Sequence, residues 1–434
     1  MKRFLLWIIG VILGVVVLLG AVMAVSYSFT GEGSRPEAAA QFGGQELEVN
    51  GSCWQVPLVG GVLDKVFAEP ETLSVQKLGV LYDAHPALTT PDWATYTTLT
   101  IQSADGAPLF TGSASEYDSF LFPANGEYKA QMTVWRLPAG GLVTRFEGGS
   151  NGAVRKNSGL EHPAKPSGWY SFSFRFTLQA SANVELSAER VEQGGIVGVA
   201  ITGMVGETAP TVETDLGSVQ CTRSPSGWRA YIPAAYNASA GAHDVTLTVN
   251  GEVLTKTLTV LPKDFGTAEV EAEPAPTEAA NTEFRNSIWP LYEQPAQEKL
   301  WSGGFVCPAE DYLVLLDFGQ IKITNGQQGS KSNSTKLYTI PGDPARAPAN
   351  GTVAFAGNLA LTGSTVVIDH GCGMRSYLYG LQTLSVTRGQ TVEKGQAVGA
   401  LGEELTIDFK LGSKSVNPWL LFQTSGGLFW RENG

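Results

Sequence analysis

Residues 341–373 read PGDPARAPANGTVAFAGNLALTGSTVVIDHGCG, and this stretch decides the fold of the C-terminal part of the chain. Two short runs within it, 351–356 and 364–369, are apolar and rich in β-branched residues, which is typical of buried strands. Residues 370–373 form a turn signal that leads into another apolar run at 374–381. Short strands at this density predict a compact β fold with a groove.

Five segments in and around this core carry a family resemblance. They are WSGGFVCP (301–308), DFGQIKITNGQ (317–327), residues 341–373 themselves, VTRGQTVEKGQAVGALG (386–402) and SVNPWLLF (415–422). In order and spacing they resemble the lysostaphin/LytM-type zinc endopeptidases, which cleave peptide cross-links in bacterial cell walls. The resemblance implies a LytM-type β domain at 301–434.

The resemblance also implies a set of site positions. The family holds zinc with the His and Asp of an H-x-x-x-D motif and the second His of an H-x-H motif, while two further histidines assist the attacking water. Carried over, H-x-x-x-D falls on Ser332 and Lys336 and the strand histidine on Gly380; counting back from residues 416–418 (VNP) puts H-x-H on Glu404 and Thr406. A lysine ammonium repels a divalent cation, so we expect no zinc, no other cofactor and no catalytic residue at these positions.

Some assignments in this domain stay open. A shift by two residues places H-x-H on Thr406 and Asp408 instead. Tyr379 adjoins Gly380, but neighbouring residues of a strand point to opposite faces, so we expect it to face away from the site. His370 is the last histidine of the chain, and we interpret it as a turn residue whose ring bonds to the backbone. Tyr379, Asp408 and His370 remain possible groove residues.

These substitutions favour a non-catalytic cell-envelope protein that binds peptidoglycan or a protein partner in wall remodelling, division or sporulation. One alternative is an active cell-wall metallo-endopeptidase with a rearranged site, in which Glu404 or Asp408 acts with His370. Another is adhesion or scaffolding by the β modules that precede the C-terminal domain. The net charge of −12 argues against nucleic acid as the partner.

The N-terminus predicts membrane attachment. Residues 4–25 carry no charge, and about 20 such residues span a bilayer. Lys2 and Arg3 precede them, which places the bulk of the chain outside the bacterial cell membrane as a single-pass protein. A cleaved signal peptide is the alternative, but its apolar region is usually shorter. Outside the cell, the four cysteines can form disulfides or remain buried thiols; they are Cys53, Cys221, Cys307 and Cys372.

The whole chain is predicted to be mainly β. We divide it into an anchor (1–27), a tether (28–44), a β-sandwich (45–180), an Ig-like module (181–264), a linker with a short helix (265–300) and the LytM-type domain (301–434). The alternating Phe172, Phe174 and Phe176 could form a sugar-binding platform, but we interpret them as core. We expect the linker helix to break at Pro290 and His243 to be an ordinary surface residue.

Overall fold

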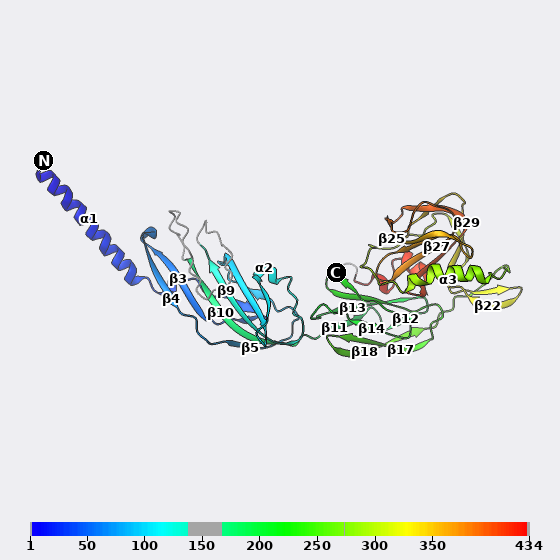
Figure 1. Ribbon diagram of the computed structural model, residues 1–434, viewed down its shortest axis with the longest axis horizontal. Helices are drawn as coiled ribbons and strands as arrows, with labels where there is room; N and C mark the ends of the chain where they lie inside the picture. Colours follow the sequence, from blue (N-terminus) through cyan, green and yellow to red (C-terminus); the bar gives the residue numbers. More distant parts are fainter. Residues whose placement is uncertain (1, 138–166, 273, 432–434) are drawn as a thin grey trace. The chain divides into compact units, whose positions relative to one another are not determined.

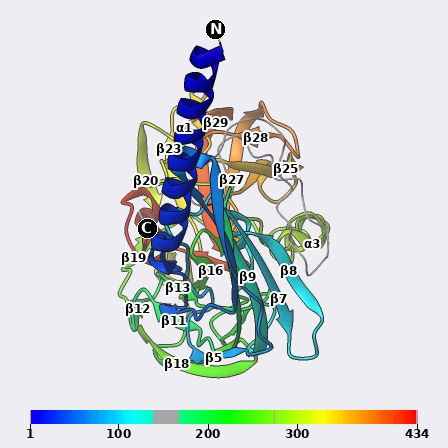
Figure 2. The ribbon, with the colours of Figure 1, turned by 90° about the vertical axis from the view of Figure 1, so that its left-hand side faces the viewer.

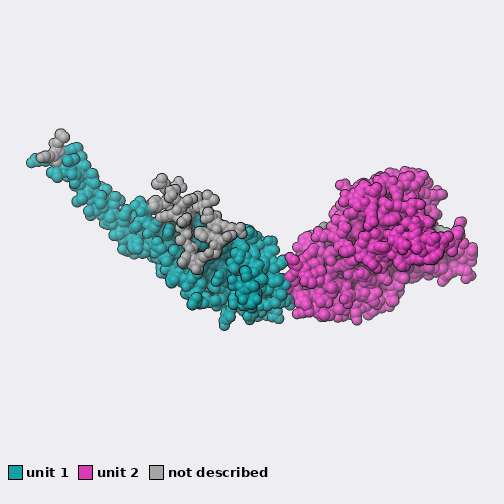
Figure 3. Space-filling model, in the orientation of Figure 1, with its two compact units in different colours: residues 1–181 teal, residues 182–434 magenta. Residues whose placement is uncertain are grey.

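The computed structural model describes residues 2–137, 167–272 and 274–431, and the chain divides into two compact units, Met1–Ser181 and Ala182–Gly434 (Figure 3). The fold is mainly β, as predicted. In the described part of the chain, one helix is long and apolar enough to cross a membrane. It is α1 (Lys2–Phe29), a continuous helix in Figure 2, and its length and composition fit a membrane span or a signal sequence.

The first unit is built on one seven-stranded sheet. Its strands are β3 (Gly51–Leu58), β4 (Leu63–Glu69), β5 (Gln76–Leu81), β7 (Tyr96–Ser103), β8 (Pro108–Ser113), β9 (Gly126–Arg136) and β10 (Ser167–Leu178). The main order is β4-β3-β10-β9-β7-β8, antiparallel throughout, and β5 pairs in parallel with β10. A second, three-stranded sheet contains β1 (Gln41–Phe42), β2 (Gln45–Glu46) and β6 (Leu88–Thr89), and a short helix, α2 (Ala114–Tyr117), follows β8.

The aromatic ladder of β10 belongs to the core of this unit, as predicted. Phe172, Phe174 and Phe176 are all buried, because strand alternation turns every second side chain inward. Phe42 packs on both Phe174 and Phe176 at ring distances of 5.1 and 5.0 Å. Phe42 lies in the segment 28–44 for which the sequence predicted a tether. The structure differs there, since burial of an aromatic side chain holds the end of this segment on the sheet.

The second unit begins with a two-sheet sandwich. One sheet has the order β11 (Asn183–Leu186), β13 (Ile196–Thr202), β16 (Gly227–Pro233) and β15 (Thr222–Ser224). The other has β12 (Arg190–Glu192), β18 (Glu252–Leu261), β17 (Gly241–Val249) and β14 (Thr211–Glu213). Asn250 and Gly251 join β17 to β18 with φ of 49° and 80°, the left-handed pair that a tight hairpin needs.

A strand and a helix follow the sandwich. The strand β19 (Thr267–Glu269) pairs in parallel with β21 (Ile321–Thr324), and the helix α3 spans Glu278–Tyr292. The prediction that the helix breaks at Pro290 is wrong. Pro290 stands in the last turn, where its missing N–H costs one bond to the Asn286 carbonyl and the helix ends two residues later.

The C-terminal domain is a nine-stranded sheet with the main order β20-β23-β29-β27-β26-β25-β28. These strands are β20 (Tyr312–Leu316), β23 (Thr335–Thr339), β29 (Ala397–Leu411), β27 (Met374–Leu384), β26 (Gly363–Asp369), β25 (Gly351–Leu359) and β28 (Thr391–Val392). The strands β24 (Pro344–Arg346) and β30 (Lys414–Val416) also pair with β29, β22 (Gln327–Lys331) pairs with β21, and α4 (Pro418–Phe422) follows. The remaining short 3₁₀ turns are η1 (Glu32–Ser34), η2 (Val59–Gly61) and η3 (Gly427–Phe429).

The structure bears on two expectations, one about the four cysteines and one about His243. All four cysteines carry free thiols, so the structure contains none of the possible disulfides. The expectation that His243 is a surface residue is wrong: its side chain is buried, with Nδ1 2.8 Å from Asp215 Oδ1 and Nε2 2.8 Å from the Ser239 carbonyl. Burial opposes the charged imidazole, but these two contacts outweigh burial and raise the pKa of His243.

Candidate functional site

Three of the carried-over positions, Lys336, Glu404 and Thr406, meet on one face of the C-terminal sheet. Lys336 lies directly opposite Thr406, and Tyr338 lies opposite Glu404. On the other side of β29, Thr406 lies opposite Tyr379. Directly opposed residues point to the same side of a sheet, so these five side chains share a face. We call it the site face.

An ion pair occupies the middle of the site face. Lys336 Nζ lies 2.9 Å from Glu404 Oε2, and the two side chains are 29% and 51% exposed. A Glu carboxylate is the one strong metal ligand among the carried-over positions, and here it accepts a charge-assisted hydrogen bond from the lysine. The cation therefore stands where the family pattern has a ligand anion.

Ser332 does not join this pair through any contact of its hydroxyl. It is buried just before β23, and its Oγ donates to the Ser334 carbonyl at 2.7 Å. Its backbone is held as well, because Ser332 N donates to the Gln320 carbonyl and Gly319 N donates to the Ser332 carbonyl. The hydroxyl stabilises a turn and is already engaged.

Gly380 and Tyr379 differ from the expectation. The pairing of β27 with β29 shifts between Tyr379 and Leu381, so Gly380 sits in a bulge with φ of 83°. A Cβ at this position would come within 2.8 Å of the Glu404 carbonyl oxygen, so the backbone admits glycine and disfavours a histidine. The expectation that Tyr379 faces away is wrong, because the bulge interrupts strict alternation and Tyr379 lies on the site face.

Helix α3 covers one side of the site face (Figure 1). Its buried Ile288 and Leu291 form a cluster with Val367, Tyr377 and Tyr379 of the sheet. The cluster also contains aromatic pairs between helix and sheet: Phe284 with Tyr379 and Tyr292 with Tyr377, each at a ring distance of 6.3 Å. Burial raises the pKa of both Tyr377 and Tyr379 well above the ordinary tyrosine value. Both phenols therefore stay neutral.

The sequence carries a signal for this helix in the spacing of its apolar residues. Phe284, Ile288 and Leu291 recur at spacings of four and three residues, which is the pattern of an apolar helix face. Thr277 begins the helix, since its side chain accepts a hydrogen bond from Ala280 N. The pattern indicates a packed helix, although it does not say which face of which sheet the helix covers.

Asp408 belongs to a different polar cluster from Glu404. It lies opposite Tyr377, is buried, and has Oδ2 2.8 Å from Lys410 Nζ and 3.3 Å from Ser415 Oγ. Burial raises the pKa of Asp408, while Lys410 opposes this shift. Each of the two carboxylates, Glu404 and Asp408, therefore already has its own lysine.

His370 is fully buried in the turn between β26 and β27. Its Nδ1 lies 2.9 Å from the Asn350 carbonyl and its Nε2 lies 2.8 Å from Ser376 Oγ, so the ring bonds to backbone as expected for a turn residue. Burial lowers the pKa of His370 to about 4, so the imidazole is neutral at pH 7. The three possible groove residues, His370, Tyr379 and Asp408, are all buried, and no open groove in the described structure exposes them.

The residues at the carried-over positions do not fit a zinc ion. They supply one lysine, one glycine, two hydroxyls and a single carboxylate that is paired with the lysine. Zinc sites in hydrolases use three His, Cys or carboxylate ligands. Among the residues that the structure describes, no group of three His, Cys, Asp or Glu is placed to hold a metal ion.

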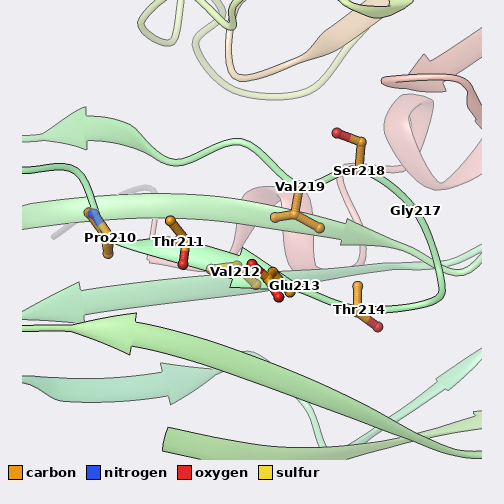
Figure 4. Close-up of a pocket in the computed structure, with 8 residues that line it drawn as sticks. All are labelled: Pro210, Thr211, Val212, Glu213, Thr214, Gly217, Ser218 and Val219. Carbon is orange, nitrogen blue, oxygen red and sulfur yellow. The ribbon is translucent and has the colours of Figure 1, made fainter. Parts of the chain in front are cut away.

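A hollow elsewhere in the second unit offers no alternative active site. It measures about 520 Å³ and is lined by eight residues of one segment, 210–219 (Figure 4). Glu213 is the one charged residue in this lining, and no carried-over position belongs to it. A catalytic pocket needs several convergent polar groups, which this hollow lacks.

Comparison with known proteins shows which family the C-terminal domain matches. Residues 330–423 match the model of Peptidase family M23. No curated protein sequence matches the chain. Residues 330–423 are therefore a domain of peptidase family M23, as the resemblance to the lysostaphin/LytM type implied.

Three solved structures are similar to parts of the chain. A Pseudomonas aeruginosa protein described as a peptidase M23 is 19% identical with a TM-score of 0.40, and the match covers 54% of this chain and 94% of that one. The catalytic domain of the prophage-encoded M23 protein EnpA from Enterococcus faecalis is 20% identical (TM-score 0.23; 25% and 91% covered). The catalytic domain of lysostaphin from Staphylococcus simulans is 18% identical (TM-score 0.21; 28% and 92% covered).

Proposed function

We propose that this chain is a membrane-anchored, non-catalytic envelope protein whose M23 domain binds a protein partner during remodelling of the cell wall. The observation that carries the proposal is the Lys336–Glu404 ion pair on the site face. Water activation by a metal needs a ligand set that leaves one position open to water. At the site positions, Lys336 instead neutralises the one carboxylate, Glu404. This supports the view that the domain keeps the scaffold of the family and lacks its chemistry.

The arrangement around the site face favours a protein partner over a wall peptide. Helix α3 covers the side of the face that carries Tyr377 and Tyr379, so a peptide would have to displace this helix to lie there. The other side is open, with exposed Leu313 on β20, Tyr338 on β23 and Ile340 just after β23. Exposed apolar side chains beside a charged pair are typical of protein-binding surfaces.

The position of β20 supports the same surface. It is an edge strand of the nine-stranded sheet, and its residues Leu313, Val314 and Leu315 are exposed in succession. An edge strand offers unpaired backbone groups to an extended segment of another protein. We therefore infer that the partner contacts β20 and the open side of the site face.

The membrane part of the proposal rests on α1. Its residues 4–25 carry no charge, and Lys2 and Arg3 precede them. Under the positive-inside rule this charge pattern supports an M23 domain outside the cytoplasm. An uncleaved α1 would keep the domain close to the cell membrane, where a partner protein of the envelope is within reach.

The test of the non-catalytic part uses the purified full chain in detergent, incubated with Zn²⁺ and isolated cell walls. We expect the walls to stay intact, whereas lysostaphin as positive control should cleave susceptible walls. Release of wall peptides that depends on Zn²⁺ and disappears in Glu404→Ala would refute the proposal.

The test of the partner surface compares three forms of the full chain in pull-downs from envelope extracts and in sedimentation with purified peptidoglycan. We expect one protein to be retained by the native chain, lost with Leu313→Asp/Tyr338→Asp, and kept with Val253→Asp, a matched exposed position on β18. If all three forms sediment with peptidoglycan and none of them retains a protein, the result would support wall binding instead and would contradict the partner surface.

A further inference from the structure

The hairpin between β3 and β4 packs beside the end of α1 (Figure 1). Its tip, residues 58–63, contains η2, and both η2 and β3 contact α1. In the last turns of α1, Met23 and Ser26 are half-buried, whereas the neighbouring residues Val22 and Val25 are exposed. Met23 and Ser26 lie three residues apart and so share one helix face.

Lys65 ties the hairpin to the helix end. Its Nζ donates hydrogen bonds to the Tyr27 carbonyl at 2.8 Å and to the Thr30 carbonyl at 2.6 Å. The same ammonium lies 4.8 Å from the centre of the Tyr27 ring. A cation on the free carbonyls of a helix C-terminus satisfies groups that otherwise need water. These contacts fix the hairpin tip at the level of the last turns of α1.

The end of α1 carries the features of a membrane boundary. The continuous apolar run ends at Val25, the aromatic Tyr27 and Phe29 follow, with Phe29 85% exposed, and the first charged residue is Glu32. Aromatic side chains are enriched at the bilayer interface. At 1.5 Å rise per residue, Met23 lies roughly 9 Å from Phe29 along the axis. A tip that packs on these turns therefore lies at the depth of the interface.

The tip itself has the chemistry of a membrane contact. Residues 58–63 read LVGGVL and carry no charge. Val62 is 64% exposed, and Val66, further along β4, is 54% exposed. Val59 adopts φ of 47°, a left-handed conformation that a β-branched residue adopts only at a cost, although glycine would fit there freely. At the tip, Val62 is thus exposed, Val59 and Leu63 are half-buried, and Leu58 is buried in the sheet.

Charged residues follow the tip along β4 and lie near its base. Asp64 and Lys65 follow the tip directly, and Arg35 pairs with Glu69 at 2.8 Å and with Glu32 at 3.4 Å. A lysine next to an apolar tip can keep its ammonium at the headgroups while its stem lies in the less polar layer. From the tip along β4, the chain therefore passes from apolar residues to the charged pair of neighbours Asp64 and Lys65 and then to ion pairs, as polarity rises from the acyl layer towards water.

We propose that the hairpin tip, residues 58–63, inserts into the outer leaflet of the same membrane that α1 spans, and that unit 1 therefore contacts the bilayer at two points. This inference rests on the anchoring of α1 in the proposed function. The occupant of the exposed apolar surface is lipid, because the surface continues the apolar surface of α1 and no charged group interrupts residues 58–63.

The test measures the depth of single probes in the full chain. Val62→Cys, Val66→Cys and Leu73→Cys, each labelled with an environment-sensitive fluorophore, are reconstituted into phosphatidylcholine and phosphatidylglycerol vesicles that contain a spin-labelled quencher lipid. The native chain labelled in the same way supplies the background from its four cysteines. Leu73 is a fully exposed control in the same unit, and Val16→Cys on α1 reports whether the helix lies in the bilayer.

We expect quenching to fall in the order Val62, Val66, Leu73, because four residues of strand separate the first two by about 13 Å. Quenching at Val62 should exceed that at Leu73 several-fold. If the Val16 probe is quenched while Val62 matches Leu73, the anchor stands and the membrane contact of the tip is refuted. If neither Val16 nor Val62 is quenched, both the anchor and the contact are refuted.

Discussion

Two polar clusters of the C-terminal domain, only a few strands apart, differ in burial. The turn cluster (Asp369, His370, Arg375 and Ser376) is buried, and Arg375 lies 2.7 Å from Asp369. The Lys336–Glu404 pair on the site face is half open to solvent. Buried charges must find partners for the fold to be stable, whereas exposed charges can change at little cost. The comparison explains how a domain can retain a family's scaffold while its site positions change.

Arg375→Met should give the largest effect in this comparison. It leaves the buried Asp369 carboxylate without its cation, and removing one partner of a buried pair costs about 3–5 kcal/mol. Native-state amide exchange of β27 and β29 in the full chain measures the free energy of opening. An Asp369→Asn/Arg375→Met double variant is the control, and it should recover part of the loss; equal loss in both would contradict the role of the pair.

His370→Gln should remove a pH dependence of stability. The pKa of the folded imidazole, about 4, lies below the ordinary value near 6.5, so the unfolded chain binds a proton that the folded chain does not. Stability from this group is complete above pH 6.5 and falls as the pH drops towards 4, by about 3 kcal/mol in total. Amide exchange at pH 7 and pH 5 should therefore show a smaller difference in the variant. The same difference in both forms would exclude His370 as the titrating group.

Ile288→Ala should loosen the helix that covers the site face. Ile288 is fully buried against the sheet, and its truncation should cost about 2 kcal/mol, the low end for a buried isoleucine, because a surface helix can settle. Amide exchange of α3 should rise more than exchange of β29. Trp289→Ala, at the exposed neighbouring position, serves as the control and should leave exchange nearly unchanged. Similar effects of the two substitutions would contradict the packing of α3.

Lys336→Met should give the smallest effect. An exposed ion pair contributes less than about 1 kcal/mol, and the methionine stem keeps most of the apolar contact of the lysine. The opening free energy of the domain should change by less than that amount, and the small change should vanish at high salt. A loss comparable to that of Arg375→Met would overturn the contrast between the two clusters.

The sequence predicted the strands well because alternation and turn residues are local signals. The ladder of β10 and the Asn250–Gly251 hairpin were found in this way. The orientation of Tyr379 was missed because a single bulge at Gly380 interrupts the alternation on which the expectation depended. His243 was missed because its partner Asp215 lies 28 residues away, on a loop that only the tertiary fold brings close. The packing of α3 over the site face was missed for the same reason, because it depends on tertiary contacts.

The proposed function requires an M23 domain without bound zinc, and the zinc content of the purified full chain tests this requirement directly. The chain is loaded with Zn²⁺, desalted and measured by elemental analysis beside its Glu404→Ala variant. We expect no stoichiometric zinc in either form. One zinc per native chain that is lost in Glu404→Ala would contradict it.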